Sequence, residues 1–233
     1  MSVRIGKETG DLLLKCHAGC AFEAVLAAAG IERTECYIKR SETVSKEVAH
    51  YDYRDEAGKL LFQVVRFEPK DFRQRRPVGS GWEWGLNGVR RVLYRLPELI
   101  AAPKRTVLVC EGEKDVDRLV KEGFLATCNP MGAGKWEESY TVSLTGRTVV
   151  IIPDADKPGQ EHAGNVLLKL TPVATACIVR PGAKDISDWF NAGHTAAELK
   201  ELCKQALKTA AVLSELKTLD LRGKLTVIQQ LTG

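Results

Sequence analysis

The sequence lacks the features that mark membrane-spanning and secreted proteins. No stretch approaches the ~20 consecutive apolar residues that a transmembrane helix needs. The first residues, MSVRIGKETGD, contain no apolar core of a signal peptide. The seven cysteines are odd in number and often lie in apolar runs, which disfavours a secreted disulfide framework. We therefore expect a soluble, cytoplasmic protein with no membrane partner.

The positive charge of the chain is concentrated in one segment. Residues 66–105 contain ten basic and four acidic side chains, a net charge of +6, whereas the other 193 residues sum to −2. A cationic segment beside a neutral or acidic body indicates a polyanionic partner. A solvated basic face is the alternative, and the charge pattern alone does not decide between the two.

The second half of the sequence predicts an α/β domain over residues 105–210. We expect strands at TVLVC, LATCN, TVVIIP and VATACIVRP, and helices at EKDVDRLVKEG, GQEHAGNVLLKL and AAELKELCKQALK. Apolar strands that alternate with amphipathic helices indicate a parallel sheet flanked by helices. The tail 211–233 is weakly patterned and is expected to be a docking helix or a linker.

The first half of the sequence is organised differently. Residues 1–36 contain CHAGC and then FEAVLAAAG, whose apolar residues recur on one helical face. Residues 37–104 are expected to form a smaller β-rich, basic subdomain, in which YDYRD and LLFQVVRFE predict a hairpin. Within it, we expect residues 69–90, which are rich in Gly, Arg and Trp, to form an irregular loop.

Carboxylates follow two of the predicted strands of the α/β domain. Glu111 comes directly after TVLVC, and Asp154 and Asp156 follow TVVIIP. Ligands bind at the carboxyl ends of strands in open parallel sheets. Two carboxylates about 5 Å apart repel by roughly 3 kcal/mol at an effective dielectric near 20, and oxygen ligands without His or Cys favour Mg²⁺ or Mn²⁺. The set therefore predicts a metal site, although any single acid could instead be a helix N-cap.

Three ordered motifs resemble the TOPRIM fold of bacterial-type primases, topoisomerases and some nucleases: VCEGEKD, IIPDADKPGQEHA and RPGAKDISDWF. The resemblance covers residues 105 to about 192, and it implies that the two strand ends above supply the principal metal-site acids. It implies further acids as secondary candidates, namely Asp115, Asp185 and Asp188. Lys114, which we place in the catalytic set, and Lys157 lie beside these acids and could contact a phosphate or offset the charge.

The order of the parts narrows the resemblance to bacterial-type DNA primases, especially those of phages and mobile elements. In that family a zinc ribbon precedes a basic subdomain and a TOPRIM domain. Cys16, His17 and Cys20 resemble the second half of such a ribbon, a remnant zinc site. A structural zinc site needs four ligands, and the fifteen residues before Cys16 contain no Cys or His.

The resemblance also implies that the basic subdomain binds the template or the nucleotide. Arginines can bind phosphates through two hydrogen bonds, and tryptophans can stack on unpaired bases. The candidates are Arg66, Lys70, Arg73, Arg75, Arg76, Trp82 and Trp84. The two tryptophans could instead cover the junction between the subdomains.

The function implied by the resemblance is that of a DNA primase catalytic core. Such a core makes short RNA primers on single-stranded DNA from ribonucleoside triphosphates with Mg²⁺ or Mn²⁺, and the family implies Zn²⁺ and a replicative helicase as further partners. A TOPRIM-type nuclease and a non-enzymatic nucleic-acid-binding factor remain alternatives. The segment NPMGAGKW is not a phosphate-binding loop, because Asn129 and Trp136 replace required residues; its glycines are expected to let the backbone pass close to the metal site.

Overall fold

A computed structural model of the chain describes residues 2–5, 12–36 and 45–218. The chain divides into two compact units, Met1–Lys46 and Glu47–Gly233. Residues 219–233, the end of the predicted tail, lie outside the described residues. No helix in the part of the chain that the structure describes is long and apolar enough to cross a membrane.

The first unit consists of a hairpin and a helix. Strand β1 (Ser2–Ile5) pairs antiparallel with β2 (Leu12–Lys15), and α1 (Phe22–Ala29) and the 3-10 helix η1 (Arg33–Cys36) follow. Helix α1 occupies the segment whose apolar spacing predicts it. It ends at Gly30, whose φ of +65° lies in the left-handed region that glycine adopts without strain.

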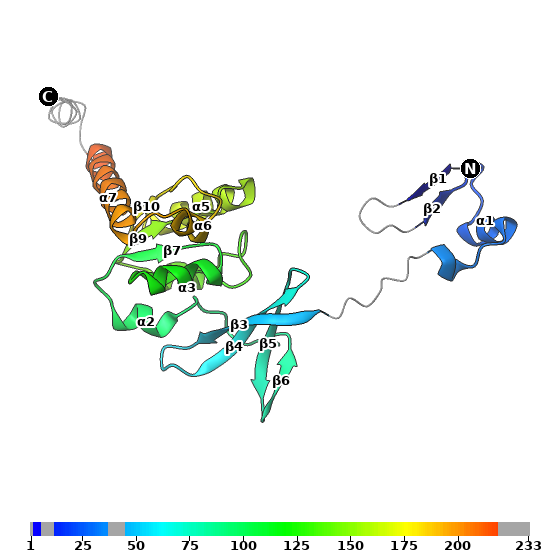
Figure 1. The fold of residues 1–233 in the computed structure, drawn as a ribbon, viewed down its shortest axis with the longest axis horizontal. Helices are drawn as coiled ribbons and strands as arrows, with labels where there is room; N and C mark the ends of the chain where they lie inside the picture. Colours follow the sequence, from blue (N-terminus) through cyan, green and yellow to red (C-terminus); the bar gives the residue numbers. More distant parts are fainter. Residues whose placement is uncertain (1, 6–11, 37–44, 219–233) are drawn as a thin grey trace. The chain divides into compact units, whose positions relative to one another are not determined.

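The second unit begins with a four-stranded sheet in the order β3-β4-β5-β6 (Figure 1). Its strands are β3 (Lys46–Arg54), β4 (Leu60–Glu68), β5 (Asp71–Val78) and β6 (Gly81–Trp84). The hairpin predicted from YDYRD and LLFQVVRFE is present as β3 and β4. The antiparallel pairs β4–β5 and β5–β6 extend it.

The expectation of an irregular loop over residues 69–90 is wrong for most of its length. Strands β5 and β6 form a hairpin through the two-residue turn Gly79-Ser80, in which Gly79 has a φ of +57°. The strand sequence DFRQRRPV has no apolar alternation, because arginine and glutamine side chains occupy positions on both faces of β5. Hydrophobic periodicity therefore could not identify this strand, whereas the Gly-Ser turn could have indicated it.

The parallel sheet predicted for the second half is confirmed. Its strand order is β10-β9-β7-β8, and all neighbouring strands are parallel. The strands are β7 (Val107–Val109), β8 (Leu125–Thr127), β9 (Thr148–Ile151) and β10 (Thr175–Ile178). Strands β7 and β9, which precede the predicted metal-site acids, are direct neighbours.

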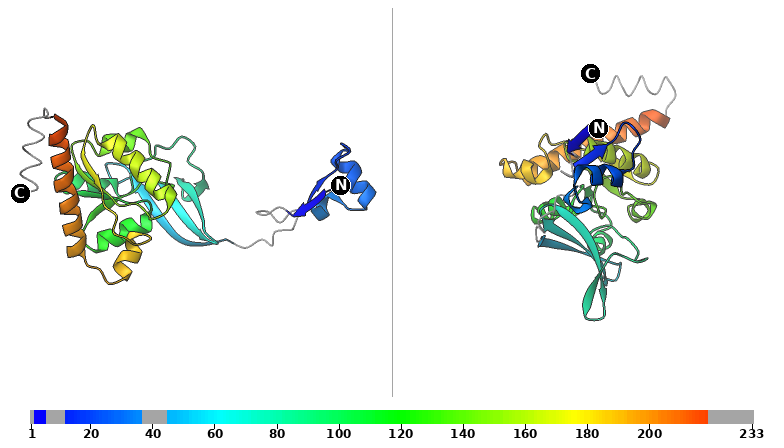
Figure 2. Two further views of the ribbon diagram at one scale, coloured as in Figure 1. Left: turned by 90° about the horizontal axis from the view of Figure 1, so that it is seen from above. Right: turned by 90° about the vertical axis from the view of Figure 1, so that its right-hand side faces the viewer.

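Helices cover both faces of the parallel sheet (Figures 1 and 2). Helices α3 (Glu113–Lys121), α6 (Ile186–Asn191) and α7 (Ala196–Thr218) share one apolar core with Leu108 and Val150. Helices α2 (Leu96–Ala101), α4 (Glu138–Ser143) and α5 (Lys157–Leu170) share the other with Val107 and Val149. The sequence predicts α3, α5 and α7; α7 continues beyond residue 210, where the tail was expected to begin.

The antiparallel sheet packs into the same core as α3. Tyr53 and Phe62 stack with ring centroids 4.5 Å apart and belong to the apolar cluster that contains Val116 of α3. The buried Tyr53 hydroxyl donates a 2.7 Å hydrogen bond to Glu113, the first residue of α3. The two sheets of this unit are therefore joined by a continuous core rather than by a linker.

Candidate functional site

The predicted acids converge at the carboxyl edge of the parallel sheet. Val109 of β7 lies opposite Ile151 of β9, so the segments that leave these two strands emerge side by side. Glu111 follows the first strand and Asp154 follows the second. We use the name carboxylate cluster for the acids gathered at this edge, which are Glu111, Asp115, Asp154, Asp156 and Asp185.

Glu111 and Asp154 form the centre of the carboxylate cluster. A Cβ atom added to Gly159 would lie 2.9 Å from Glu111 Oε2 and 3.1 Å from the Asp154 Cβ. Both distances start from the same point, so Glu111 Oε2 and the Asp154 Cβ are close neighbours. Glu111 Oε2 is buried and has no hydrogen-bond partner. An orphaned carboxylate oxygen beside a second acid is the environment that a bound cation would stabilise.

The electrostatics of the cluster reflect this crowding. Burial, and then the charges of Glu111, Asp115, Asp185 and Asp156, raise the pKa of Asp154 to about 7. Burial and the charge of Asp156 also raise the pKa of Glu111. A hydrogen bond from the backbone of Ala133 and the charge of Lys70 lower the pKa of Glu111 in the opposite direction. The negative charge is thus only partly compensated by the protein itself.

The other members of the carboxylate cluster have structural partners. Asp156 is the N-cap of α5 and accepts a 2.8 Å hydrogen bond from the Gly159 backbone N–H. Asp185 caps α6 in the same way, and the buried Asp115 accepts hydrogen bonds from the backbone and the hydroxyl of Ser187. The N-cap alternative therefore holds for Asp156 and Asp185, each of which keeps a second carboxylate oxygen outside the cap.

No three side chains of the described residues are arranged to enclose an ion. Among these residues, no group of three or more His, Cys, Asp or Glu side chains could hold a metal in the present conformation. The side chain of Asp188, a predicted secondary ligand, is exposed on α6. The structure thus brings Glu111 and Asp154 together and places Asp115, Asp156 and Asp185 around them.

A loop that the sequence analysis only partly anticipated supports Glu111. Asn129, fully buried, lies 3.1 Å from His162 Nε2 of α5, and the Gly134 N–H donates to His162 Nδ1 at 3.2 Å. Burial lowers the pKa of His162, which favours its neutral form. Gly132 has a φ of +68°, and a Cβ there would lie 3.8 Å from Glu111 Oε1, so the backbone does pass close to the acid as expected from NPMGAGKW.

The arginines of β5 are already engaged in ion pairs. Three consecutive pairs lie along the strand: Arg73 with Asp71 at 2.8 Å, Arg75 with Glu47 at 2.9 Å, and Arg76 with Glu83 at 2.7 Å. Such pairs neutralise the positive charge that the sequence suggested for phosphate binding.

Two cations of the basic subdomain differ from the β5 arginines. Lys70, in the turn between β4 and β5, is near enough to Glu111 to lower the pKa of its carboxyl group. Arg66 hydrogen-bonds Tyr51, and its buried Nε has no partner. Of the predicted nucleotide-binding cations, the structure thus places Lys70 beside the carboxylate cluster.

The two tryptophans of β6 lie on the open face of the antiparallel sheet. Trp82 is 44% exposed and Trp84 is 53% exposed. The Arg75 guanidinium lies 4.7 Å from the Trp82 ring centroid. The alternative that the tryptophans cover the junction is wrong, because the opposite face of the sheet, with Tyr53 and Phe62, forms that junction.

The predicted lysines beside the acids have different surroundings. Lys114 Nζ lies 3.5 Å from Asp185 Oδ2, so this lysine borders the carboxylate cluster. Lys157, at the start of α5, is highly exposed and pairs with Glu161 of its own helix at 3.7 Å. Lys114 is thus held by an acid of the cluster, whereas Lys157 has no such partner among the residues that the structure describes.

The first unit brings together two of its three candidate zinc ligands. The Cys16 and Cys20 side chains hydrogen-bond each other; backbone N–H groups of Cys20 and Ala18 lower the pKa of Cys16, and the bond to Cys16 raises that of Cys20. His17 is exposed, and no third ligand completes a site within the described ranges. The thiol pair alone is half of a four-ligand zinc site.

Comparisons with known proteins identify the fold. No protein-family model and no curated protein matches the sequence. The structure is similar to the Escherichia coli primase catalytic core, with a TM-score of 0.52 and 17% identity over 74% of this chain and 57% of that chain. It is similar to a DNA primase domain from Pseudomonas aeruginosa, with a TM-score of 0.53 and 17% identity over 78% of this chain and 61% of that one.

A third similar structure is the DnaG primase catalytic domain bound to ssDNA, with a TM-score of 0.51 and 19% identity. That match covers 77% of this chain and 61% of the DnaG chain. The chain therefore spans about three fifths of the primase structures that it resembles. Its parallel sheet with flanking helices and its antiparallel sheet therefore have the fold of the bacterial primase catalytic cores that it resembles.

Proposed function

We propose that this protein is a primase catalytic core that makes short RNA primers on single-stranded DNA. The observation that carries the proposal is the buried, partnerless Glu111 Oε2 beside Asp154, at the edge of a sheet with the primase fold. A structural protein gains nothing from two acids placed together without a paired cation, since their repulsion lowers its stability.

The donors fit a hard divalent cation. Glu111 and Asp154 would hold Mg²⁺ or Mn²⁺. Asp156 would contribute the oxygen that does not cap α5 only after its side chain moves, since no three acids of the described residues enclose an ion in the present conformation. The bound ion would stabilise the charge that develops on the α-phosphate during attack. Asp115 and Asp185 surround these ligands and, through Ser187 and Lys114, hold α3 and α6 in place around the site.

The residues of the chain have separate tasks in this reaction. Lys70, whose charge acts on Glu111, and Lys114, which lies 3.5 Å from Asp185, would orient triphosphate oxygens. The bare backbone at Gly159 leaves room for the two acids to stay close together. The primer 3′-hydroxyl forms a new bond to the α-phosphorus as diphosphate leaves, and the hydroxyl proton passes to solvent or to a cluster carboxylate.

The proposed contact with the template uses an exposed surface of the antiparallel sheet. One of the similar structures is a primase domain bound to ssDNA. We propose that the open face of the antiparallel sheet contacts single-stranded template by stacking bases on Trp82 and Trp84, a contact worth ~1–3 kcal/mol per base. A replicative helicase and a zinc ion at Cys16 and Cys20 are proposed on the family resemblance alone.

A primer-synthesis assay tests the proposed function. The variants Glu111→Gln and Asp154→Asn should lower ribonucleotide incorporation with Mn²⁺ or Mg²⁺ by roughly 10²–10³-fold, since each removes a charge that holds the ion. Glu138→Gln, an exposed acid in the first turn of α4, is the matched control and should retain activity. Circular dichroism should show that all three variants are folded.

The same assay separates the alternatives. Shortening of labelled RNA or DNA in the presence of metal but without nucleotides would identify a nuclease. DNA binding that Asp154→Asn leaves unchanged, with no catalysis under any condition, would identify a non-enzymatic binding factor. Robust synthesis by Asp154→Asn would contradict the proposal directly.

A further inference from the structure

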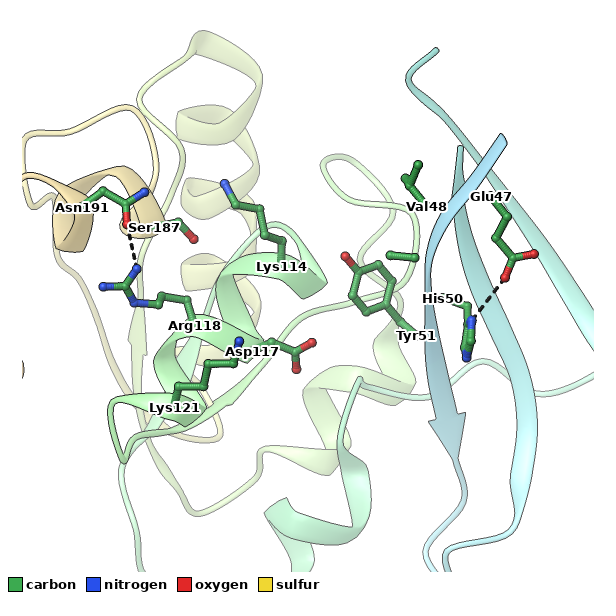
Figure 3. Close-up of a pocket in the computed structure, with 11 residues that line it drawn as sticks. Glu47, Val48, His50, Tyr51, Lys114, Asp117, Arg118, Lys121, Ser187 and Asn191 are labelled. Atoms are coloured by element: carbon green, nitrogen blue, oxygen red, sulfur yellow. Dashed lines mark hydrogen bonds and ion pairs between the residues drawn. The ribbon is translucent and has the colours of Figure 1, made fainter. Parts of the chain in front are cut away.

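One pocket of the chain lies beside the proposed catalytic centre. It measures about 780 Å³ and opens between β3 and α3 (Figure 3). Two of its cations are already held, since Lys114 pairs with Asp185, and Arg118 pairs with Glu122 and bonds Asn191. This pocket therefore belongs with the site described above, whereas a second pocket differs from it in both place and charge.

The second pocket, of about 430 Å³, opens at the amino ends of two strands of the parallel sheet. Arg105 and Thr106 precede β7, and Gly123 and Phe124 precede β8. Residues 200–207 of α7 supply the other wall. The carboxylate cluster lies at the opposite, carboxyl ends of the strands, so none of the residues assigned to primer synthesis lines this pocket.

The floor of the second pocket is apolar. Leu108 is buried in the core on this side of the sheet, and Phe124 and Leu207 pack against that core while remaining partly exposed. Cys203 is buried, and burial raises the pKa of its thiol to about 11, so the thiol is uncharged at neutral pH. Such a floor can accept an apolar side chain, because contact with it removes apolar surface from water.

The rim of the second pocket is cationic, and no acid is among the described residues that line it. Arg105 is exposed, donates a 2.7 Å hydrogen bond to a backbone carbonyl and forms no ion pair with a described residue. Lys200 is also exposed and without an ion pair in the described part of the chain; its Nζ lies 5.7 Å from the Phe124 ring centroid. Lys204 pairs only with Glu201, at 3.8 Å and on an exposed surface, where such pairs are weak. The rim is therefore open to negative charge.

These two chemistries together define the partner. A peptide with an apolar residue among acidic ones presents an apolar side chain to the floor and carboxylates to the rim. A nucleic-acid strand binds through exposed ring faces on which its bases stack, whereas the Phe124 ring is partly buried with Lys200 over it. Residues 219–233 of the chain itself contain one acidic and two basic residues, a net charge of +1, and so do not complement the rim.

We propose that the second pocket docks an acidic peptide segment of a partner protein. An apolar side chain of the segment packs against Phe124 and Leu207. Carboxylates on either side of it pair with Arg105, Lys200 and Lys204. The inference goes beyond the proposed function, because it assigns a protein partner to a surface that primer synthesis does not use.

Fluorescence anisotropy of a labelled peptide added to the full chain tests the inference. The probe is a synthetic peptide with two leucines between four acidic residues on each side. Lys200→Glu and Lys204→Glu should each weaken its binding at low ionic strength by at least about tenfold, because an attractive charge becomes repulsive. Lys169→Glu makes the same charge change at an exposed position of α5, whose core lies on the other face of the sheet, and is the matched control. Its affinity should stay within about twofold of the parent.

A second peptide separates docking from general attraction between charges. It has serine in place of both leucines and the same net charge, and it should bind at least about fivefold more weakly because it has no apolar side chain for the floor. Equal binding of the two peptides overturns the inference. Failure of the leucine peptide to bind the parent, or equal affinity in the parent and the two pocket variants, overturns it as well.

Other occupants of the pocket would give different results, each of which overturns the inference. A thymidine oligonucleotide that binds through Lys200 more tightly than the leucine peptide would identify a nucleic-acid strand. A peptide with the sequence of residues 219–233 that displaces the leucine peptide would identify the end of this chain. Dimers of the parent that Lys200→Glu dissociates, without binding of the leucine peptide, would identify a second copy.

Failure of this inference and failure of the proposed function are distinguishable. Lys200→Glu and Lys204→Glu should make primers within about twofold of the parent, since the pocket lies at the end of the strands opposite the carboxylate cluster. If the two variants lose peptide binding and the parent makes no primers, the docking surface stands and the primase proposal fails. If primers are made and peptide binding is insensitive to both lysines, the reverse is true. Circular dichroism should show that the variants are folded.

Discussion

The arginines of the antiparallel sheet and the acids of the parallel sheet are both concentrations of one charge, but they are held in opposite ways. Arg73, Arg75 and Arg76 each have an acidic partner within 3 Å. Among the residues that the structure describes, no cation forms an ion pair with Glu111 or Asp154, and Glu111 Oε2 is buried without a hydrogen bond. A count of charges in the sequence treats the two sets alike, whereas the structure shows that only the acids are left uncompensated.

The difference matters because the two arrangements have different energetic consequences. Surface ion pairs typically contribute about 0–1 kcal/mol, so the paired arginines are close to neutral in both charge and stability. Adjacent unpaired carboxylates lower stability until a proton or a cation reaches them. Binding of a cation at the carboxylate cluster is therefore expected to stabilise the protein more than binding at the paired arginines would.

The largest effect is expected from a substitution that changes the spacing of Glu111 and Asp154. Gly159→Ala would put a Cβ 2.9 Å from both the Asp154 carbonyl oxygen and Glu111 Oε2, which must then move. Overpacking of this kind costs about 1–3 kcal/mol of the free energy of unfolding. A misplacement of about 1 Å can reduce a rate roughly 10²-fold. Primer synthesis and thermal denaturation measure the two effects.

Gly164→Ala is the matched control for that change. Gly164 lies in the same helix, α5, and a Cβ there would meet no atom within 4 Å. Alanine should stabilise the helix by up to about 1 kcal/mol and leave synthesis unchanged. Equal activity of the two alanine variants would show that the spacing of Glu111 and Asp154 is not needed for the reaction.

A smaller effect is expected when Lys70 or the ion-paired Arg75 is replaced by alanine. Lys70→Ala removes the charge that lowers the pKa of Glu111 and should reduce primer synthesis by about tenfold, or ~1.4 kcal/mol, without changing the melting temperature. Arg75→Ala removes the ion pair with Glu47 and the stacking on Trp82, so it should lower the melting temperature by about 2–4 °C. A destabilised but fully active Lys70→Ala would reverse this assignment of roles.

The smallest expected effect concerns pH. The pKa of Asp154 is raised from 3.8 to about 7, so the folded protein holds a proton that the unfolded chain releases between these values. Stability in EDTA should therefore fall as pH rises from about 4 to above 7. Asp154→Asn removes this dependence and should raise the melting temperature at pH 8 by about 2–4 °C, after allowance for solvent screening.

Divalent ions provide the control for the pH experiment. Magnesium or manganese should raise the melting temperature of the parent at pH 8, because an ion that binds only the folded state stabilises it. The same ions should have little effect on Asp154→Asn. A parent protein whose melting temperature does not change with pH or with metal would show that Asp154 is not in an acidic environment.

Much of the fold could be predicted from sequence because buried strands and amphipathic helices have distinct apolar patterns. The parallel sheet, α3 and α5 follow from such patterns. The rule that parallel strands share an edge places Glu111 near Asp154 only if β7 and β9 are neighbours, and the structure shows that they are. Strands β5 and β6 could not be predicted in this way. The polar side chains of β5 form ion pairs with residues distant in the sequence, such as Glu47, and hydrophobic periodicity does not reveal such pairs.

The candidate site was predictable in its acids but not in its support. The charge of Lys70, in the turn between β4 and β5, acts on Glu111, which follows β7, and nothing local in the sequence brings these two residues near each other. The same is true of His162, which holds the loop at Asn129 and Gly134 from another helix. Tertiary contacts of this kind depend on the packing of whole elements, whereas an N-cap such as Asp156 depends only on its neighbours.

The hydrogen bond between Tyr53 and Glu113 has a mechanical consequence. Glu113 is two residues from Glu111, and Tyr53 belongs to the sheet that also carries the exposed tryptophans. Tension applied to that sheet by a moving strand of nucleic acid would pass through a buried phenol directly into the turn that holds the first acid. A force on the outer surface of the sheet would then shift the position of Glu111.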